Sequence, residues 1–289
     1  MRTILLNQSN IVPGTNNSIL SYTLPGGGAY FQDTQKVALT SCSMFYSTFN
    51  ITAAYNNNSF QYIWIDGNTY TVQFPDGYYE IESINSFLEF TFIQNGHYLI
   101  SSTTGKFVYF ITLDINTALY SIETNCFVMN QDLFPPTSYT PAVSKVAWTI
   151  PVVGLTPCLV ILTNAFSNII GYKTGSYPAT INNTINKISQ SSTAPQLSPL
   201  SSFTMTCSLV NNSYSVPNNL FYCFSPSGSI GSYYNTAPNE FVWLSIPPGQ
   251  RTEIVITFTD QDNRAVAIYD PNIVIMLAIS DPNEVIGSK

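Results

Sequence analysis

Four side chains with ligand oxygens crowd into one stretch of the sequence, TFTDQDNRAVAIYDP. They are Asp260, Asp262, Asn263 and Asp270. A helix-loop-helix calcium loop requires oxygen ligands at its first, third and fifth positions, then a glycine, and a glutamate at its twelfth. Counted from Asp260, the fifth residue is an arginine, no glycine follows it, and the twelfth is a proline. Because Asp and Asn bond to their own backbone and tolerate left-handed conformations, we predict a hairpin turn; an ion near Asp260 and Asp262 is the alternative.

Catalysis by an imidazole has one candidate, because His97 is the only histidine. It follows an Asn-Gly pair without a G-x-S-x-G motif or a paired cysteine, so we interpret it as an edge or turn residue. Glycoside hydrolysis requires two carboxylates, and five of them lie within 24 residues: Asp66, Asp76, Glu80, Glu82 and Glu89. Turns and the solvent-facing side of an amphipathic helix account for all five. We therefore predict no catalytic residue and no enzymatic activity.

The sequence also disfavours metal and phosphate binding. The cysteines are odd in number, far apart and without a C-x-x-C pair: Cys42, Cys126, Cys158, Cys207 and Cys223. Zinc sites use closely spaced thiolates or imidazoles, so we expect five reduced residues of the core. The segment GYKTGSYP, from Gly171 to Pro178, lacks the spacing of a phosphate loop. The prediction is therefore no cofactor and no metal ion.

The polar residues of this chain are mostly uncharged. Charged residues make up 9% of the 289 residues, and the formal net charge is -7, whereas ordinary soluble domains contain about 25% charged residues. The nine basic residues are scattered singly, so the sequence shows no basic stripe for nucleic acid. Other protein copies can cover an uncharged polar surface at low desolvation cost, because buried interface centres are depleted of Lys, Glu and Asp. Assembly is therefore the first hypothesis.

The apolar stretches of the sequence indicate in which cellular compartment the protein folds. The apolar run from Ile4 to Leu6 near the N-terminus is too short for the core of a signal peptide. No stretch approaches the ~20 apolar residues that a membrane span requires. We expect a protein that is made and folded inside a cell.

Both ends of the chain alternate with period two and are punctuated by Gly, Pro and Asn, which is typical of an all-β fold. We predict strands near residues 2–6, 19–24, 37–50, 203–210, 220–224, 241–246, 253–260 and 272–280. Seven or eight strands suffice for a single eight-stranded jelly roll of two facing sheets. The predicted fold class is mainly β, a jelly-roll sandwich with a large inserted β-rich (α+β) domain.

The middle of the chain has a different sequence pattern, with signals for helices as well as strands. Asp66-Gly67-Asn68 separates two aromatic-rich runs, as in a β-hairpin. Downstream, Ile81, Ile84 and Leu88 follow one another at helical spacing. A second short helix, NAFSNIIG, is expected to stop at Gly171. Further strands are predicted near residues 107–115 and 119–128.

The predicted domain boundaries follow from this change in sequence pattern. The Ser- and Pro-rich segment from Asn186 to Ser202 is typical of a connector. We expect residues 1–50 and 196–289 to form the jelly roll and residues 51–195 to form the insertion. A sandwich loop tolerates such an insertion because closure entropy grows only slowly with loop length.

Four stretches of the sequence resemble one family, the vertex (penton) minor capsid proteins of virophages and Polinton-like viruses. They are KVALTSCSMFYSTFNIT, FPDGYYEIESINSFL, FSNIIGYKTGSYP and IPPGQRTEIVITFTDQDNRAVAIYDPNIVIMLAI, in the family's order. These stretches carry turns and core residues and no catalytic signature. The resemblance implies a jelly-roll subunit that forms pentamers at the vertices of a virion, beside hexon-like double jelly-roll major capsid trimers. It also implies an inserted domain that projects outward.

The predicted function is accordingly a structural minor capsid protein, and two other classes stay open. A β-sandwich adhesin or receptor-binding protein would use some of the 19 tyrosines to bind glycans. A secreted or cell-surface β-enzyme would lose hydrolysis when a carboxylate near Asp76 is removed. The capsid hypothesis is favoured because a closed shell buries several sides of every subunit, which suits an uncharged polar surface.

Overall fold

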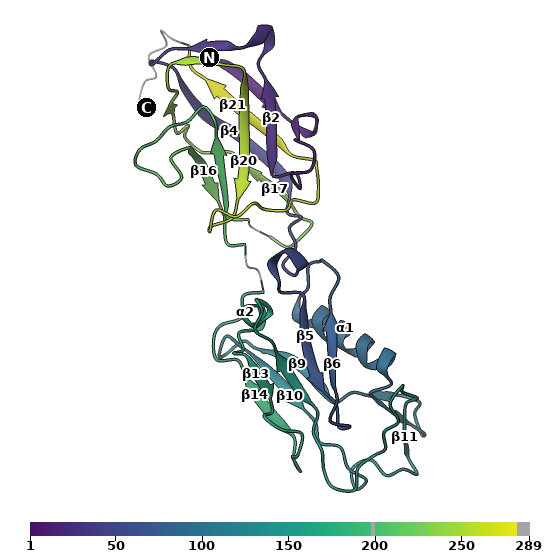
Figure 1. Cartoon of the computed structure of the whole chain (residues 1–289). Coiled ribbons are helices and arrows are strands. Elements are labelled where there is room, and N and C mark those ends of the chain that lie inside the picture. The colour runs from purple at the N-terminus through teal and green to yellow at the C-terminus, as the bar shows by residue number, and fades with distance from the viewer. Residues whose placement is uncertain (198–199, 227, 282–289) are drawn as a thin grey trace. The chain divides into compact units, whose positions relative to one another are not determined.

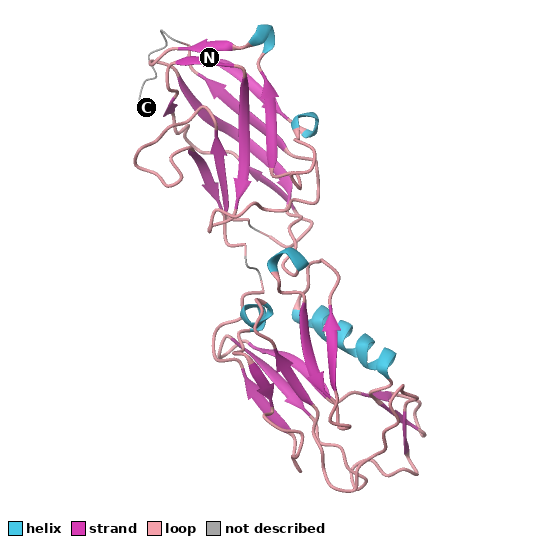
Figure 2. Ribbon diagram, in the orientation of Figure 1, coloured by secondary structure: helices cyan, strands magenta, loops and turns pink. Residues whose placement is uncertain are grey.

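A computed structural model of the chain describes residues 1–197, 200–226 and 228–281. The described chain is mainly β, with antiparallel sheets and two α-helices (Figure 2). It divides into two compact units (Figure 1). The first unit comprises Met1–Thr48 and Leu200–Lys289, and the second comprises Phe49–Pro199. The first unit is therefore built from both ends of the sequence, while the second is one continuous segment.

Two antiparallel sheets make up most of the first unit. One has the order β1-β21-β4-β17, with β18 also paired to β4. Its strands are β1 (Arg2–Leu6), β4 (Lys36–Phe45), β17 (Tyr233–Thr236), β18 (Leu244–Ser245) and β21 (Val274–Ile279). The other has the order β16-β15-β20-β2, with strands β2 (Ile19–Thr23), β15 (Phe203–Cys207), β16 (Leu220–Phe224) and β20 (Glu253–Thr259). The remaining elements are the paired strands β3 (Ala29–Phe31) and β19 (Gly249–Arg251) and the 3-10 helices η1 (Gln8–Asn10) and η2 (Pro25–Gly27).

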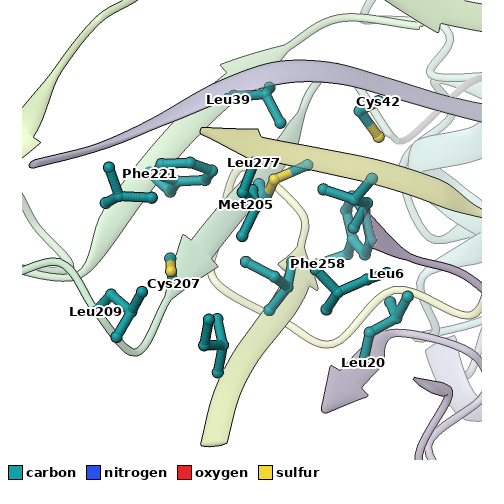
Figure 3. Packing of buried hydrophobic residues seen from close by; sticks show 14 of the residues in the cluster. Leu6, Leu20, Leu39, Cys42, Met205, Cys207, Leu209, Phe221, Phe258 and Leu277 are labelled. Carbon is teal, nitrogen blue, oxygen red and sulfur yellow. The ribbon is translucent and has the colours of Figure 1, made fainter. Parts of the chain in front are cut away.

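The inward-facing side chains of these two sheets form one hydrophobic core. Along β20, Ile254, Ile256 and Phe258 are buried while the residues between them are not, as the period-two alternation predicts. Leu39 and Leu277, from the first sheet, belong to the same cluster as Phe258, from the second (Figure 3). Each buried side chain of this size contributes about 1.5–3 kcal/mol. The core therefore holds together strands that lie far apart in the sequence.

Three predicted strands of this unit are shorter in the structure. The strand predicted at 37–50 ends at Phe45, the strand predicted at 203–210 ends at Cys207, and the strand predicted at 241–246 is only Leu244–Ser245. The first sheet uses Tyr233–Thr236 as an additional strand, which the sequence did not predict. These four residues are flanked by Gly, Asn and Pro, and so short a run has too few alternations to be recognised.

Three small antiparallel sheets and two helices make up the second unit. The sheets have the orders β13-β12-β5-β6, β14-β10-β9 and β11-β7-β8. Their strands are β5 (Ser59–Ile63), β6 (Thr69–Gln73), β7 (Leu99–Ser101), β8 (Phe107–Val108), β9 (Ile111–Asn116), β10 (Ser121–Cys126), β11 (Tyr139–Pro141), β12 (Cys158–Ile161), β13 (Gly175–Tyr177) and β14 (Lys187–Gln190). The helices are α1 (Ile81–Asn95), α2 (Phe166–Ile170) and the 3-10 helix η3 (Ala53–Tyr55). The hairpin predicted at Asp66-Gly67-Asn68 joins β5 to β6 and is confirmed.

Both predicted helices are present. Helix α1 continues beyond the predicted segment because Phe92 extends the buried face that begins at Ile81. Helix α2 ends at Gly171, whose φ is +73°, as predicted. A Cβ at this glycine would lie 2.2 Å from the carbonyl oxygen of Thr193, so a side chain does not fit there. No helix in the described part of the chain is long and apolar enough to cross a membrane.

The connector predicted at 186–202 contains a strand. Residues Lys187–Gln190 form β14, which pairs with β10 from Cys126 to Glu123. The prediction is therefore wrong for these four residues. Strand β14 lies at the edge of its sheet, and its Ile188 is exposed. Because its apolar residue is not buried, the hydrophobic pattern of the sequence carries no signal of this strand.

Candidate assembly surface

The acidic stretch after β20 is a turn. The carboxylate oxygen Oδ1 of Asp260 accepts the backbone N–H groups of Asp262 and Arg264, both at 2.8 Å. Its Oδ2 accepts the Nε–H of Arg264 at 2.8 Å, and Asn263 adopts a left-handed conformation with φ +61°. The backbone pairs again across the turn at Thr259 and Ala265. The turn interpretation is confirmed, since both Asp260 oxygens hold the turn together.

Removing the Asp260 carboxylate is expected to destabilise this turn. Asp260 is buried, so Asp260→Ala leaves backbone donors unpaired and lowers the free energy of unfolding by about 2 kcal/mol. The control is Asp262→Ala, because that side chain is 60% exposed and pairs with Arg264 at the surface. A surface pair of this kind contributes at most about 1 kcal/mol. Urea unfolding of the full chain measures both, and equal losses would contradict the structural role of Asp260.

His97 lies in the core of the second unit. The sequence interpreted it as an edge or turn residue, and it directly follows the turn at Gly96, the C-cap of α1. It is nevertheless only 1% exposed, so the expectation of an edge residue is wrong. Its Nδ1 hydrogen-bonds with the hydroxyl of Tyr62 at 2.7 Å, and its ring stacks on Trp64 with 4.7 Å between centroids. Burial lowers the pKa of His97 to about 4. The contacts of His97 are therefore those of a residue that packs in the core.

The cluster of carboxylates serves turns and a helix surface. Asp66 accepts the backbone N–H of Asn68 at 2.8 Å and the hydroxyl of Tyr70 at 2.6 Å. Asp76 accepts the backbone N–H of Ala53 at 2.7 Å. The other three lie at or on α1, outside its buried face: Glu80, Glu82 and Glu89. These contacts account for the carboxylates as the sequence predicted.

Four of the five cysteines are core residues: Cys42, Cys126, Cys158 and Cys207. Burial raises the pKa of the Cys42 thiol to about 12. Cys223 is exposed, which corrects the prediction for this residue, because it faces outward opposite Thr204. Within residues 1–197, 200–226 and 228–281, no group of three or more His, Cys, Asp or Glu side chains could hold a metal ion.

The outer surface of the β1-β21-β4-β17 sheet carries no charged side chain over its central rows. We call this surface the uncharged face and define it by Thr3, Leu5, Ser41, Ser43, Phe45, Tyr233, Asn235, Val274 and Met276. Cross-strand pairing makes the rows contiguous, since Met276 pairs with both Leu5 and Ser41. Phe45 and Tyr233 pack edge to face with 5.3 Å between their centroids. Leu5 is 47% exposed and Tyr233 is 60% exposed, so apolar and aromatic surface is available for contact.

The outer surface of the β16-β15-β20-β2 sheet is similar in chemistry. We call it the threonine face and define it by Ser21, Cys223, Val255, Thr257 and Thr259. Thr204 and Thr206 lie on the same side of β15 but are buried. Glu253, at one end of β20, accepts a hydrogen bond from the Ser21 hydroxyl at 2.8 Å. Neither face presents a Lys or Arg within these rows. Burial against another protein therefore removes few charges from water, which keeps the desolvation cost low.

The sequence contains a signal for both faces that the prediction did not use. In an antiparallel strand, the residues between the core positions point to the outer side of the sheet. In β20 these residues include Thr257 and Thr259, and in β21 they include Val274 and Met276. Outer positions of a solvated sheet are ordinarily polar, and often charged. Uncharged residues at successive outer positions would therefore have predicted a surface that contacts another protein.

Comparisons with known proteins give structural similarity only. No family model matches the chain, and no curated protein matches it. The chain is similar to the crystal structure of the mavirus penton protein over 96% of this chain and 97% of that one, with 11% identity and a TM-score of 0.43. It is also similar to a chain in the cryo-EM structure of the Sputnik virophage over 96% and 97%, with 12% identity and a TM-score of 0.37. Similarity at this level does not by itself transfer a function.

Proposed function

We propose that the chain is a structural minor capsid protein, the penton that forms the pentameric vertices of an icosahedral virophage-like or Polinton-like particle. The observation that carries this proposal is the lack of charged side chains over the central rows of both outer faces of the first unit's sheets. Faces of this chemistry suit burial against neighbouring subunits. The role is structural and not enzymatic, and its place is the capsid of a virion assembled inside the host cell.

Strand order supports a single eight-stranded jelly roll in the first unit. Lettering β1, β2, β4, β15, β16, β17, β20 and β21 from B to I turns the two sheet orders into B-I-D-G and F-E-H-C. Two facing sheets of this kind, built from two Greek keys, characterise a jelly roll. In this proposal the jelly roll comprises residues 1–50 and 196–289. Residues 51–195 are a domain inserted between strands D and E.

The two faces also support a closed ring of copies. A five-fold ring uses heterologous interfaces, in which two different surfaces of the subunit meet. The uncharged face and the threonine face belong to different sheets, so each subunit can offer one to each neighbour. The proposed partners are therefore other copies of this chain and a hexon-like double jelly-roll major capsid protein. Sequence-specific nucleic-acid binding is not part of the proposal, because the nine basic residues are scattered.

The oligomeric state of the purified protein tests this function. We expect sedimentation velocity to find pentamers, either of the chain alone or after mixing with a trimeric major capsid protein. Electron microscopy of intact particles is expected to place the chain at the five-fold positions. Monomers at all concentrations, even with the trimer present, would contradict the proposal. Monomers that also bind glycans on an array would favour the adhesin alternative.

A further inference from the structure

A pocket of about 360 Å³ lies in the first unit, at the end of the sandwich where β1 begins. Ile4 of β1 and Ile279 of β21 line it from one sheet, and Tyr22 of β2 lines it from the other. Phe31 of β3 contributes a further wall. These four side chains belong to the hydrophobic core of the unit or pack against it. The pocket is therefore an extension of the core, and its volume lies in the range of small-molecule sites, which begins at about 300 Å³.

Arg2 occupies a core-facing position at the mouth of this pocket. Side chains alternate between the two sides of a strand, so Arg2 lies on the same side of β1 as Ile4 and the buried Leu6. Across the sheet it pairs with Ile279. The Arg2 side chain is 75% exposed, which places its guanidinium at the solvent end of the pocket. Among the described residues that line the pocket, Arg2 alone carries a charge.

The Arg2 guanidinium retains hydrogen-bonding capacity. Its Nε lies 3.7 Å from Oδ1 of Asp281, which is too far for a hydrogen bond. Within the described ranges, Arg2 makes no hydrogen bond through its other side-chain N–H groups. A guanidinium carries five N–H donors in a planar fork that matches the two oxygens of a carboxylate. Arg2 can therefore bind an anion at the mouth of the pocket.

Hydrogen bonds fix the walls of the pocket. Gln35 lines it and is buried. Its Oε1 accepts the backbone N–H of Gln32 at 3.0 Å, and its Nε2 donates to the carbonyl oxygen of Ser280 at 3.2 Å. On another wall, the N–H of Leu24 donates to the carbonyl oxygen of Thr252 at 2.8 Å. A pocket with fixed walls requires little ordering when a ligand binds, which favours affinity.

The size and charge of the pocket select its occupant. Its volume equals that of roughly a dozen water molecules at about 30 Å³ each, which suits a chain of about eight to ten carbon atoms. A folded protein requires about 20–30 residues a side for a stable interface, so it cannot enter. A phosphate monoester carries nearly two negative charges at pH 7, whereas the single cation of Arg2 balances one. A carboxylate carries one negative charge and matches the guanidinium fork.

We propose that this end of the sandwich binds a free carboxylic acid with an apolar body of about eight to ten carbon atoms. The apolar body lies against Ile4, Phe31 and Ile279, and the carboxylate pairs with the guanidinium of Arg2 at the mouth. The site lies inside one subunit, between its two sheets. The proposal therefore goes beyond the proposed role in assembly and does not depend on it.

Three ligands with the same eight-carbon chain test the proposal on the full protein: octanoate, 1-octanol and octylammonium. Titrations followed by saturation-transfer NMR are expected to show octanoate binding about five-fold more tightly than 1-octanol, the effect of one exposed ion pair. Octylammonium should bind least, because Arg2 repels it. No binding of octanoate, or equal affinities for octanoate and 1-octanol, would overturn the proposal. Tighter binding of acetyl-Gly-Gly-Leu with a free carboxylate would also overturn it and assign the pocket to the C-terminus of another protein.

Two variants locate the carboxylate. Arg2→Gln is expected to weaken octanoate binding about five-fold and to leave 1-octanol binding unchanged, which also shows that the variant folds. The matched control is Arg251→Gln, which removes the same charge from the same unit at a residue that does not line the pocket. This control should bind octanoate as the wild type does. Equal losses of octanoate binding in both variants would overturn the role of Arg2.

A third variant locates the apolar body of the ligand. Tyr30 lines the pocket and is 71% exposed, so Tyr30→Ala removes a wall without disturbing the core. This variant is expected to weaken the binding of octanoate and 1-octanol by the same factor, because both ligands share the chain that the wall covers. Unchanged binding of both ligands would place the chain outside this pocket and overturn the proposal.

Discussion

Tyr233→Glu is expected to abolish formation of the pentamer. Tyr233 is exposed on the uncharged face and packs against Phe45. On assembly, a carboxylate at this position would be buried among side chains that offer it no cationic partner. An unpaired buried charge costs about 3–5 kcal/mol, which corresponds to a loss of about a hundredfold or more in affinity at each interface. Sedimentation velocity over a range of protein concentrations measures this loss.

Tyr214→Glu is the matched control for this experiment. Tyr214 belongs to the same unit and is 98% exposed, but it lies in the loop between β15 and β16 and not on either face. The same change of chemistry there should leave the pentamer intact, and circular dichroism checks that both variants fold. If Tyr233→Glu assembles as the wild type does, the uncharged face is not the contact between copies.

The second unit is expected to lose stability as the pH falls from 6.5 towards 4. Burial lowers the pKa of His97 from 6.5 to about 4 in the folded chain, while the unfolded chain keeps the ordinary value. Between these two pH values the unfolded state binds a proton that the folded state does not, so the free energy of unfolding decreases as the pH falls. The complete shift corresponds to about 3 kcal/mol. Thermal unfolding followed by tryptophan fluorescence reports it, since Trp64 stacks on His97.

His97→Gln separates this effect from the titration of carboxylates. Glutamine keeps a hydrogen-bonding group near Tyr62 but does not titrate. The variant is expected to be less stable than the wild type at pH 7, because the stacking on Trp64 is lost, and to depend less steeply on pH between 6.5 and 4. The carboxylates titrate in both proteins, so the difference between the two profiles belongs to His97. Parallel profiles would show that His97 does not determine the acid sensitivity.

Short motifs in the sequence predicted those elements whose conformation depends mainly on a few neighbouring residues. The Asp260 turn, the hairpin at Asp66-Gly67-Asn68 and the end of α2 at Gly171 all depend on backbone conformations that a few residues impose. The long strands β20 and β21 alternate clearly because one side of each packs in the core. These elements could be read from the sequence with their approximate ends.

Other elements could not be read because their residues are held by contacts with distant parts of the chain. Strand β17 is four residues long and exists because β4 pairs with it, and β14 exists because β10 does. The burial of His97 likewise depends on β5, which brings Tyr62 and Trp64 to the end of α1. A short or polar run has no periodicity of its own, so only its partners reveal it.

The charge composition of the chain favoured the hypothesis of contact between proteins, because removing water from an uncharged polar surface costs little free energy. It could not indicate where that contact lies. The location that we propose follows from the cross-strand register, which sets Leu5, Met276 and Ser41 in one row although they are far apart in the sequence. Composition is a property of the whole chain, whereas a surface is made by residues that folding brings together.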